Sequence, residues 1–371
     1  MKSAIGWPIL RVVCQIVLLG IPLLVISGQA QTTAYVTNTS GTVSVINAKT
    51  NTIVATISVG TFPSGVAIKP GGTRAYVANI FNSISVIDTA SNTVVATIPS
   101  GQFPTGLAIT PDGTRVYVVN QLLTNGTNTV SVIETITNTI VATIPVGLGP
   151  IAVAITPDGS RAYVPDQQDF IISVVDTATN TVVTTIPISG GAGVAVTPDG
   201  TRAYVTSPGD GTVSVIDIAT NTVVATIFLG TNQNPSGVAI TPDGSRAYVT
   251  INLPNIVSVI DTTTNTVVTT IPVGLSPMGV AITPDGTRAY VTNDDSNTIS
   301  VIDTATNTVA ATLGVGIGPN AIAISPGIGP PTNKDQCKDG GWRIFTIPRK
   351  FKNQGNCVSF VNIGGHRHAI K

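Results

Sequence analysis

The sequence predicts an all-β fold: a seven-bladed β-propeller of four-stranded antiparallel blades, whose ring closes when the last strand joins the first blade. Three observations predict it. A Tyr-Val pair recurs at a nearly constant interval, each interval divides into four short strands, and the two ends of the repeated region complement each other. Composition agrees, because only 10% of the residues are charged and 5% are aromatic, while residues that suit pleated sheets are abundant.

The Tyr-Val pairs account for every tyrosine of the 371-residue chain, with spacings of 41, 41, 46, 41, 44 and 42 residues. They begin at Tyr35, Tyr76, Tyr117, Tyr163, Tyr204, Tyr248 and Tyr290. The unit that starts at Gly279 predicts strands at 279–283, 288–292, 299–303 and 309–313. A Pro-Asp-Gly-Thr turn joins the first two strands, and its glycine suits the left-handed position of a tight hairpin.

The ends of the repeated region predict how the ring closes. The chain enters the repeats at Tyr35, in a second strand, and leaves them at 320–326, which has the pattern of a first strand. We therefore expect Ala321–Ser325 to complete the blade that begins at Tyr35. Closure of this kind removes an exposed sheet edge.

With this repeat, the chain resembles the YVTN-repeat β-propellers of bacterial and archaeal surface-layer and periplasmic proteins. The resemblance covers roughly residues 33–326 and recurs in all seven units. It implies the fold and not an activity, because propellers host many unrelated functions.

Residues 1–30 have the pattern of an export signal. Lys2 and Arg11 precede an apolar run from Val12 to Ile26, and small residues precede Gln31. We expect cleavage after Ala30, with an uncleaved membrane anchor as the alternative. After cleavage no integral membrane domain is expected, and the protein is secreted, periplasmic or at the cell surface.

The remaining chain divides into a propeller (31–326), a linker (327–333) and a small basic tail (334–371). Two cysteines in an exported chain predict a disulfide between Cys337 and Cys357. The tail resembles a short Cys-pair segment found at the C-termini of exported bacterial proteins. Residues 31–331 carry eight basic and sixteen acidic residues, so nucleic acid is not expected as a partner.

The titratable residues of the propeller are few in kind. Both histidines, His366 and His368, lie in the tail, and the only glutamate, Glu134, occupies a repeat position where other units have aspartate. This excludes an imidazole metal site and a Ser-His-Asp triad from the propeller. The repeated tyrosines predict packing between blades. The six repeated arginines predict salt bridges at the turns, with an anion-binding ring as the alternative.

Five acidic residues stand outside the repeat pattern, and we expect them in the variable loops between second and third strands. These ligand-face candidates are Asp166, Asp169, Asp210, Asp294 and Asp295. Variable loops on a rigid scaffold often carry function, although sequence drift in such loops is the alternative. No metal site or cofactor is expected, and Ca²⁺ is the one ion that an acidic rim would favour.

The sequence as a whole favours a non-catalytic binding or scaffold module with a protein or cell-surface component as partner. No catalytic residue is predicted. The alternative is an extracytoplasmic enzyme on a propeller scaffold, lactonase-like or dehydrogenase-like. The absence of histidine and the single glutamate in the propeller argue against this alternative.

Overall fold

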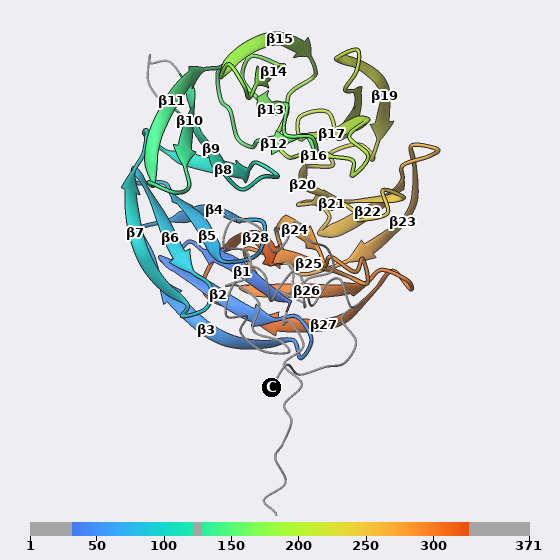
Figure 1. Ribbon diagram of the computed structural model, residues 1–371. Coiled ribbons are helices and arrows are strands. Elements are labelled where there is room, and N and C mark those ends of the chain that lie inside the picture. The colour runs from blue at the N-terminus through green and yellow to red at the C-terminus, as the bar shows by residue number, and fades with distance from the viewer. Residues whose placement is uncertain (1–31, 122–127, 326–371) are drawn as a thin grey trace, which may run out of the picture.

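The computed structural model describes residues 32–121 and 128–325, and 28 strands in seven sheets make up the regular structure of this part (Figure 1). Every sheet has four antiparallel strands, so the predicted fold class is confirmed. None of the described residues forms a helix that is long and apolar enough to cross a membrane. The predicted signal, linker and tail, with both tail cysteines, lie outside the described residues.

The innermost strand of each blade contacts the innermost strands of its two neighbours around the ring. In blades 1 to 7 these strands are β28 (Pro319–Ser325), β4 (Pro63–Ile68), β8 (Pro104–Ile109), β12 (Ala154–Ile155), β16 (Val194–Val196), β20 (Pro235–Ile240) and β24 (Pro277–Ile282).

The second strands carry the Tyr-Val pairs. In the same blade order they are β1 (Thr33–Asn38), β5 (Arg74–Asn79), β9 (Arg115–Asn120), β13 (Arg161–Asp166), β17 (Arg202–Ser207), β21 (Arg246–Ile251) and β25 (Arg288–Asn293). The third strands are β2 (Thr42–Asn47), β6 (Ser83–Asp88), β10 (Thr129–Glu134), β14 (Ile171–Asp176), β18 (Thr212–Asp217), β22 (Ile256–Asp261) and β26 (Thr298–Asp303).

The outermost strands expose β-branched side chains at the rim. They are β3 (Thr52–Ser58), β7 (Thr93–Pro99), β11 (Thr139–Pro145), β15 (Thr181–Pro187), β19 (Thr222–Phe228), β23 (Thr266–Pro272) and β27 (Thr308–Gly314). A β-bulge interrupts the register between each third and fourth strand, as at Val45 and Ile46 in blade 1. Such bulges increase local twist and protect an edge from pairing with another chain.

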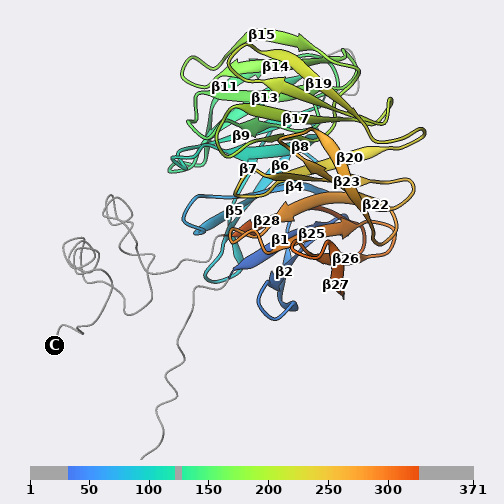
Figure 2. The ribbon, with the colours of Figure 1, turned by 90° about the vertical axis from the view of Figure 1, so that its right-hand side faces the viewer.

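The ring closes as predicted. β28 pairs antiparallel with β1, and the register places Ile324 opposite Ala34 and Ala323 opposite Tyr35. Figure 2 shows these two strands side by side, where the described ends of the chain meet. The first and last parts of the repeated region therefore form one blade.

Apolar side chains gather in seven clusters, one at each junction between neighbouring blades. At the junction of blades 1 and 2, Tyr35, Val43 and Val45 from one sheet pack against Val77 and Ile87 from the next. Burying both faces of every sheet is what a blade needs from its neighbours, because one sheet cannot shield both faces alone. The seven tyrosines are at most 2% exposed, which confirms their predicted role in packing between blades.

Candidate functional site

The ring has two chemically different faces. One carries the turns from first to second strand and from third to fourth strand, and we call it the turn face. The other carries the loops from second to third strand and the connections from one blade to the next, and we call it the loop face. The repeat pattern varies little at the turn face, whereas the loop face varies in length and sequence.

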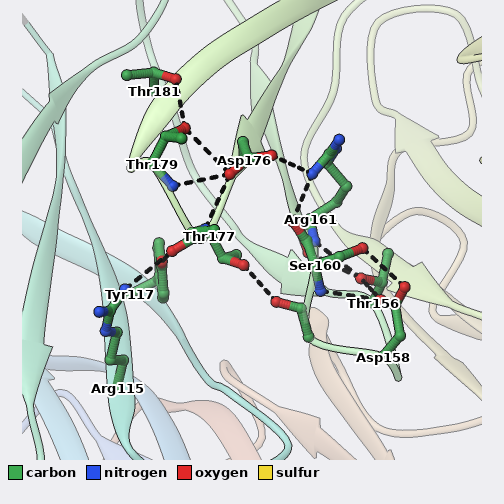
Figure 3. Close-up of polar contacts among 12 residues, drawn as sticks. Arg115, Tyr117, Thr156, Asp158, Ser160, Arg161, Asp176, Thr177, Thr179 and Thr181 are labelled. Carbon is green, nitrogen blue, oxygen red and sulfur yellow. Dashed lines mark hydrogen bonds and ion pairs between the residues drawn. The ribbon is translucent and has the colours of Figure 1, made fainter.

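Carboxylates at the turn face accept hydrogen bonds from residues of their own turns. Asp158 accepts hydrogen bonds from the hydroxyl of Thr156 at 2.5 Å and from the amide and hydroxyl of Ser160 (Figure 3). These bonds hold the pKa of Asp158 below its usual range. Glu134 likewise accepts a bond from Thr137 at 2.7 Å, in keeping with its repeat position. Such hydrogen bonds stabilise the turns, and the lowered pKa makes Asp158 a weak base.

The repeated arginines are also engaged. Arg74 and Arg161 form ion pairs with Asp88 and Asp176 of their own blades. Arg115 instead donates to the carbonyl oxygen of Thr177 in the next blade at 2.9 Å, beside the hydroxyl of Tyr117 (Figure 3). The remaining three make equivalent bonds to the next blade, from Arg202, Arg246 and Arg288. The structure therefore supports the structural interpretation of these arginines over an anion-binding ring.

Hollows open at the turn face between neighbouring blades. One of them, of about 510 Å³, is lined by residues that include Asp243, Arg246 and Asp285. Both carboxylates accept hydrogen bonds within their turns, from Thr241 and Thr283 respectively. Equivalent hollows occur at more than one junction between blades, and their charged side chains bond to the turns or to the next blade.

Asp166 lies in a different place from the one expected. It is the last residue of β13 and is fully buried, so it does not belong to an exposed loop. Ser173 donates a hydrogen bond to its Oδ2 at 2.6 Å. Burial, with a smaller contribution from the negative charge of Asp169, raises the pKa of Asp166 to about 6. The same position holds a buried asparagine in four other blades: Asn38, Asn79, Asn120 and Asn293.

Asp169 and Asp210 lie in exposed parts of the loops of blades 4 and 5. Oδ2 of Asp169 accepts a hydrogen bond from the amide of Leu148 at 2.7 Å, which ties this loop to the preceding connection. The structure does not bring these two residues together with the aspartates of blade 7. In the described chain no group of three or more histidine, cysteine or acidic residues is arranged to hold a metal ion. The expectation of Ca²⁺ therefore stays a prediction.

Asp294 and Asp295 follow β25 in blade 7 and differ in their contacts. The hydroxyl of Ser276 donates to Oδ2 of Asp295. The carboxylate of Asp294 has no hydrogen-bond partner among the described residues and is only partly exposed. Partial burial first, and then the charge of Asp295, raise the pKa of Asp294. Asp294 thus differs from the saturated turn carboxylates in being both accessible and free to take a proton.

Two further residues, Thr39 and Gly318, lie close to Asp294 at the loop face. A Cβ built on Gly318 would lie 2.0 Å from Oγ1 of Thr39 and 3.0 Å from Oδ1 of Asp294. Only glycine fits between them, and its φ of 64° also favours glycine. Sequence reasoning missed Thr39 and Gly318. The Gly-Pro pair before the last strand was the available signal, since it marks a close approach of the backbone.

A family model described as a lactonase with a seven-bladed β-propeller matches residues 149–314. This segment covers blades 4 to 7, under half of the chain, and contains all five aspartates outside the repeat. The comparison with curated proteins found no match.

Many solved structures share the fold. Hydrazine synthase from Kuenenia stuttgartiensis is 25% identical, with a TM-score of 0.68 over 75% of this chain and 96% of that chain. A periplasmic gluconolactonase from Pseudomonas aeruginosa is 18% identical, with a TM-score of 0.68 over 80% and 99%. A putative 6-phosphogluconolactonase from Bacteroides fragilis is 21% identical, with a TM-score of 0.67 over 80% and 98%.

The match to a lactonase family contradicts the prediction of a non-catalytic binding or scaffold module, and that prediction is wrong. The alternative of an enzyme on a propeller scaffold agrees better with this finding. The prediction failed because it treated histidine and glutamate as necessary. An aspartate whose pKa is raised by its surroundings can serve as a general base.

Proposed function

We propose that the protein is an extracytoplasmic hydrolase that opens lactone rings at the loop face of the propeller, with Asp294 as general base. One observation carries this proposal: Asp294 is partly exposed, has a raised pKa and has no hydrogen-bond partner among the described residues. The match of its segment to a lactonase family supports the reaction class.

Hydrolysis of a lactone needs one water and a group that moves one proton. In the proposed step, Asp294 takes a proton from water as the oxygen of that water attacks the carbonyl carbon. The bond between the carbonyl carbon and the ring oxygen then breaks, and the ring oxygen takes the proton back from Asp294. The product is a hydroxy acid. The hydroxyl of Thr39, beside Gly318, donates to the carbonyl oxygen of Ile317 at 3.3 Å. In the proposed step it turns to donate instead to the carbonyl oxygen of the lactone as negative charge develops there.

Replacing the base tests the proposal. Asp294→Asn keeps the shape of the side chain and removes the base, so kcat should fall by about 10²-fold or more. Acid release from an uncharged δ-lactone, followed by pH-stat titration, measures the rate. Asp303→Asn is the matched control, because it makes the same charge change at the turn face of the same blade, and blade 1 already has Asn47 at that position.

The pH profile supplies a second readout. Because the pKa of Asp294 is raised, the acidic limb of kcat/KM should lie above the ordinary range of aspartate, near 3.9. Asp295→Asn removes the neighbouring charge and should move this limb to lower pH. Equal rates for Asp294→Asn and the unchanged protein on every lactone tried would remove Asp294 from the reaction.

We infer further that the propeller is of the YVTN-repeat type and acts outside the cytoplasm. In blades 1 and 7 the tetrapeptide Tyr-Val-Thr-Asn is complete, and each residue has a role in the ring. Thr292, for example, accepts a bond from the amide of Gly279 and donates one to the carbonyl of Asn320 in the next blade. The pattern of residues 1–30 supports export, and fractionation of producing cells with detection of the mature N-terminus tests it.

A further inference from the structure

Two phenylalanines occupy a backbone position with positive φ, which glycine adopts most readily. In blades 1 to 4 and 7 a proline begins the innermost strand or, in blade 4, leads into it. The carbonyl oxygen of the residue before this proline accepts a hydrogen bond from the backbone amide of the residue after the second strand. Gly149, Gly318 and Ser276 do so with φ values of 70°, 64° and 53°. Phe62 and Phe103 occupy the same position with φ values of 50° and 44°. Left-handed backbone is uncommon for a bulky residue and costs about 1 kcal/mol or more.

A third phenylalanine repeats this anomaly in another place on the same face. The residue before a third strand accepts a bond from the amide that follows the fourth strand, again with positive φ. Phe170 fills this position in blade 4 with φ 57°. The corresponding residues in five other blades are Gly41, Asn82, Gly211, Asn255 and Asn297.

The folded state gains little from the rings of Phe62 and Phe170, whereas Phe103 is half-buried. The side chains of Phe62 and Phe170 are 48% and 59% exposed. Phe62 makes an edge-to-face contact with Phe81, at 5.9 Å between centroids, and Phe81 is itself 57% exposed. Residues in strained backbone conformations cluster at active sites and ligand clamps, so these phenylalanines point to a ligand at the loop face.

Apolar residues continue around the ring on the connections between blades. Leu275 and Ile317, which are 55% and 68% exposed, lie on the connections into blades 7 and 1, on either side of the loop that carries Asp294. Phe62 and Phe103 lie on the next two connections, and exposed Leu148 lies on the one after. An apolar arc therefore runs through five consecutive connections and begins beside Asp294.

Charge is divided between the two faces in the described part of the chain. All eight of its lysines and arginines lie at the turn face, with eleven of its sixteen acidic residues. The loop face has four aspartates at its surface, a fifth, Asp166, buried beneath it, and no basic residue. A face of this kind repels phosphates and carboxylates and offers them no partner for an ion pair.

From the strained phenylalanines, the apolar arc and the absence of cations, we propose that the loop face selects uncharged lactones with an apolar substituent and rejects phosphorylated sugar lactones. The inference rests on the proposed lactone hydrolysis and adds its substrate class. The apolar arc takes the substituent, while the ring is held at Asp294.

Three substrates separate the possibilities: δ-decalactone, which carries an alkyl chain, δ-valerolactone, which does not, and 6-phosphogluconolactone. We expect kcat/KM for δ-decalactone to exceed that for δ-valerolactone by about tenfold or more, because burying several methylene groups favours binding. Hydrolysis of 6-phosphogluconolactone should be slower than that of either. Comparable rates on 6-phosphogluconolactone and δ-decalactone would overturn the inference and leave lactone hydrolysis standing.

Variants at the strained positions test the role of the rings. Phe62→Gly with Phe103→Gly places at both positions the residue that blades 1 and 4 already use, so the fold should persist. The ratio of kcat/KM between δ-decalactone and δ-valerolactone should fall by about tenfold. Ile136→Ala is the control. It removes a side chain that is 81% exposed at the turn face, where blade 4 has Ala178, and should not change the ratio.

Binding separates the failure of this inference from the failure of lactone hydrolysis. The lactam analogue of δ-decalactone keeps the ring and the chain but resists hydrolysis, and calorimetry measures its affinity. If no lactone is hydrolysed but the lactam binds, and binds at least about tenfold more weakly to the double glycine variant, the substrate class stands without the reaction. If the lactam does not bind, or binds both proteins equally, the inference is wrong.

Discussion

The hydroxyl of Tyr290 in blade 7 donates a hydrogen bond to Oδ1 of Asn51 in blade 1 at 2.8 Å, joining residues that are 239 positions apart in sequence. The same bond recurs at every junction of the ring. Its other members are the pairs Tyr35–Asn92, Tyr76–Asn138, Tyr117–Asn180, Tyr163–Asn221, Tyr204–Asn265 and Tyr248–Asn307. Each asparagine has a φ between 52° and 56°, which asparagine tolerates better than most residues.

Removing one hydroxyl from this circle should weaken the closure of the ring. Tyr290→Phe keeps the buried ring but deletes the bonds to Asn51 and to the carbonyl of Ala48. We expect the free energy of unfolding to fall by about 1–2 kcal/mol, the usual loss for a buried hydrogen bond. Urea denaturation measures it. An unchanged midpoint would show that water replaces the lost hydroxyl at no cost.

Alkaline pH should weaken the same junctions. Burial raises the pKa of Tyr35 and of Tyr163 to about 12, whereas an exposed tyrosine in the unfolded chain titrates near 10. Their protonated forms therefore stabilise the fold fully below pH 10, and this stability is lost as pH rises from 10 to 12. Unfolding midpoints at pH 8, 10 and 11 measure the loss. Tyr163→Phe should make the decline shallower, and an identical slope would argue against this tyrosine as a cause.

Sequence reasoning located the blades, the closure and the packing role of the tyrosines, because these follow from periodicity and from residue type. It did not locate the partner of each tyrosine hydroxyl, since that partner lies in the next blade. It expected Asp166 in an exposed loop, although the asparagines at the same position of other blades indicated a buried site. The pKa of Asp294 and the φ of Phe62 depend on surroundings that a sequence does not display.

The raised pKa of Asp166 predicts that the free energy of unfolding depends on pH. The pKa of its buried carboxyl is about 6, against about 3.9 in the unfolded chain. The protonated form favours folding, so its contribution is full below pH 3.9 and is lost as pH rises through 6. At pH 7.5 the penalty approaches about 3 kcal/mol. Asp166→Asn should therefore raise the free energy of unfolding at pH 7.5, with a gain that disappears near pH 4.

The matched comparison for this variant is the asparagine that four other blades use. There the side-chain amide donates to a serine, as Asn293 does to Ser300 at 2.9 Å, and the amide that Asp166→Asn introduces should donate to Ser173 in the same way. Asp210→Asn makes an equal change of charge at an exposed position and should give no such gain. If Asp166→Asn is equally stabilising at pH 4 and pH 7.5, the effect is not due to the ionised carboxylate.

The pairing of β28 with β1 predicts that removing β28 prevents the ring from closing. A chain that ends at residue 319 lacks nearly all of β28, which pairs with β1 and packs beside β4 and β24. Blade 1 would lose its innermost strand, and Ala34, Val36 and Ile46 would lose part of their cover. We expect this chain to aggregate or to lose its cooperative melt, because an open ring exposes apolar faces and an unpaired edge. A chain that ends at residue 332 retains β28 and should melt cooperatively. Differential scanning calorimetry of the two chains checks this, and equal melting would mean that β28 is not needed to close the ring.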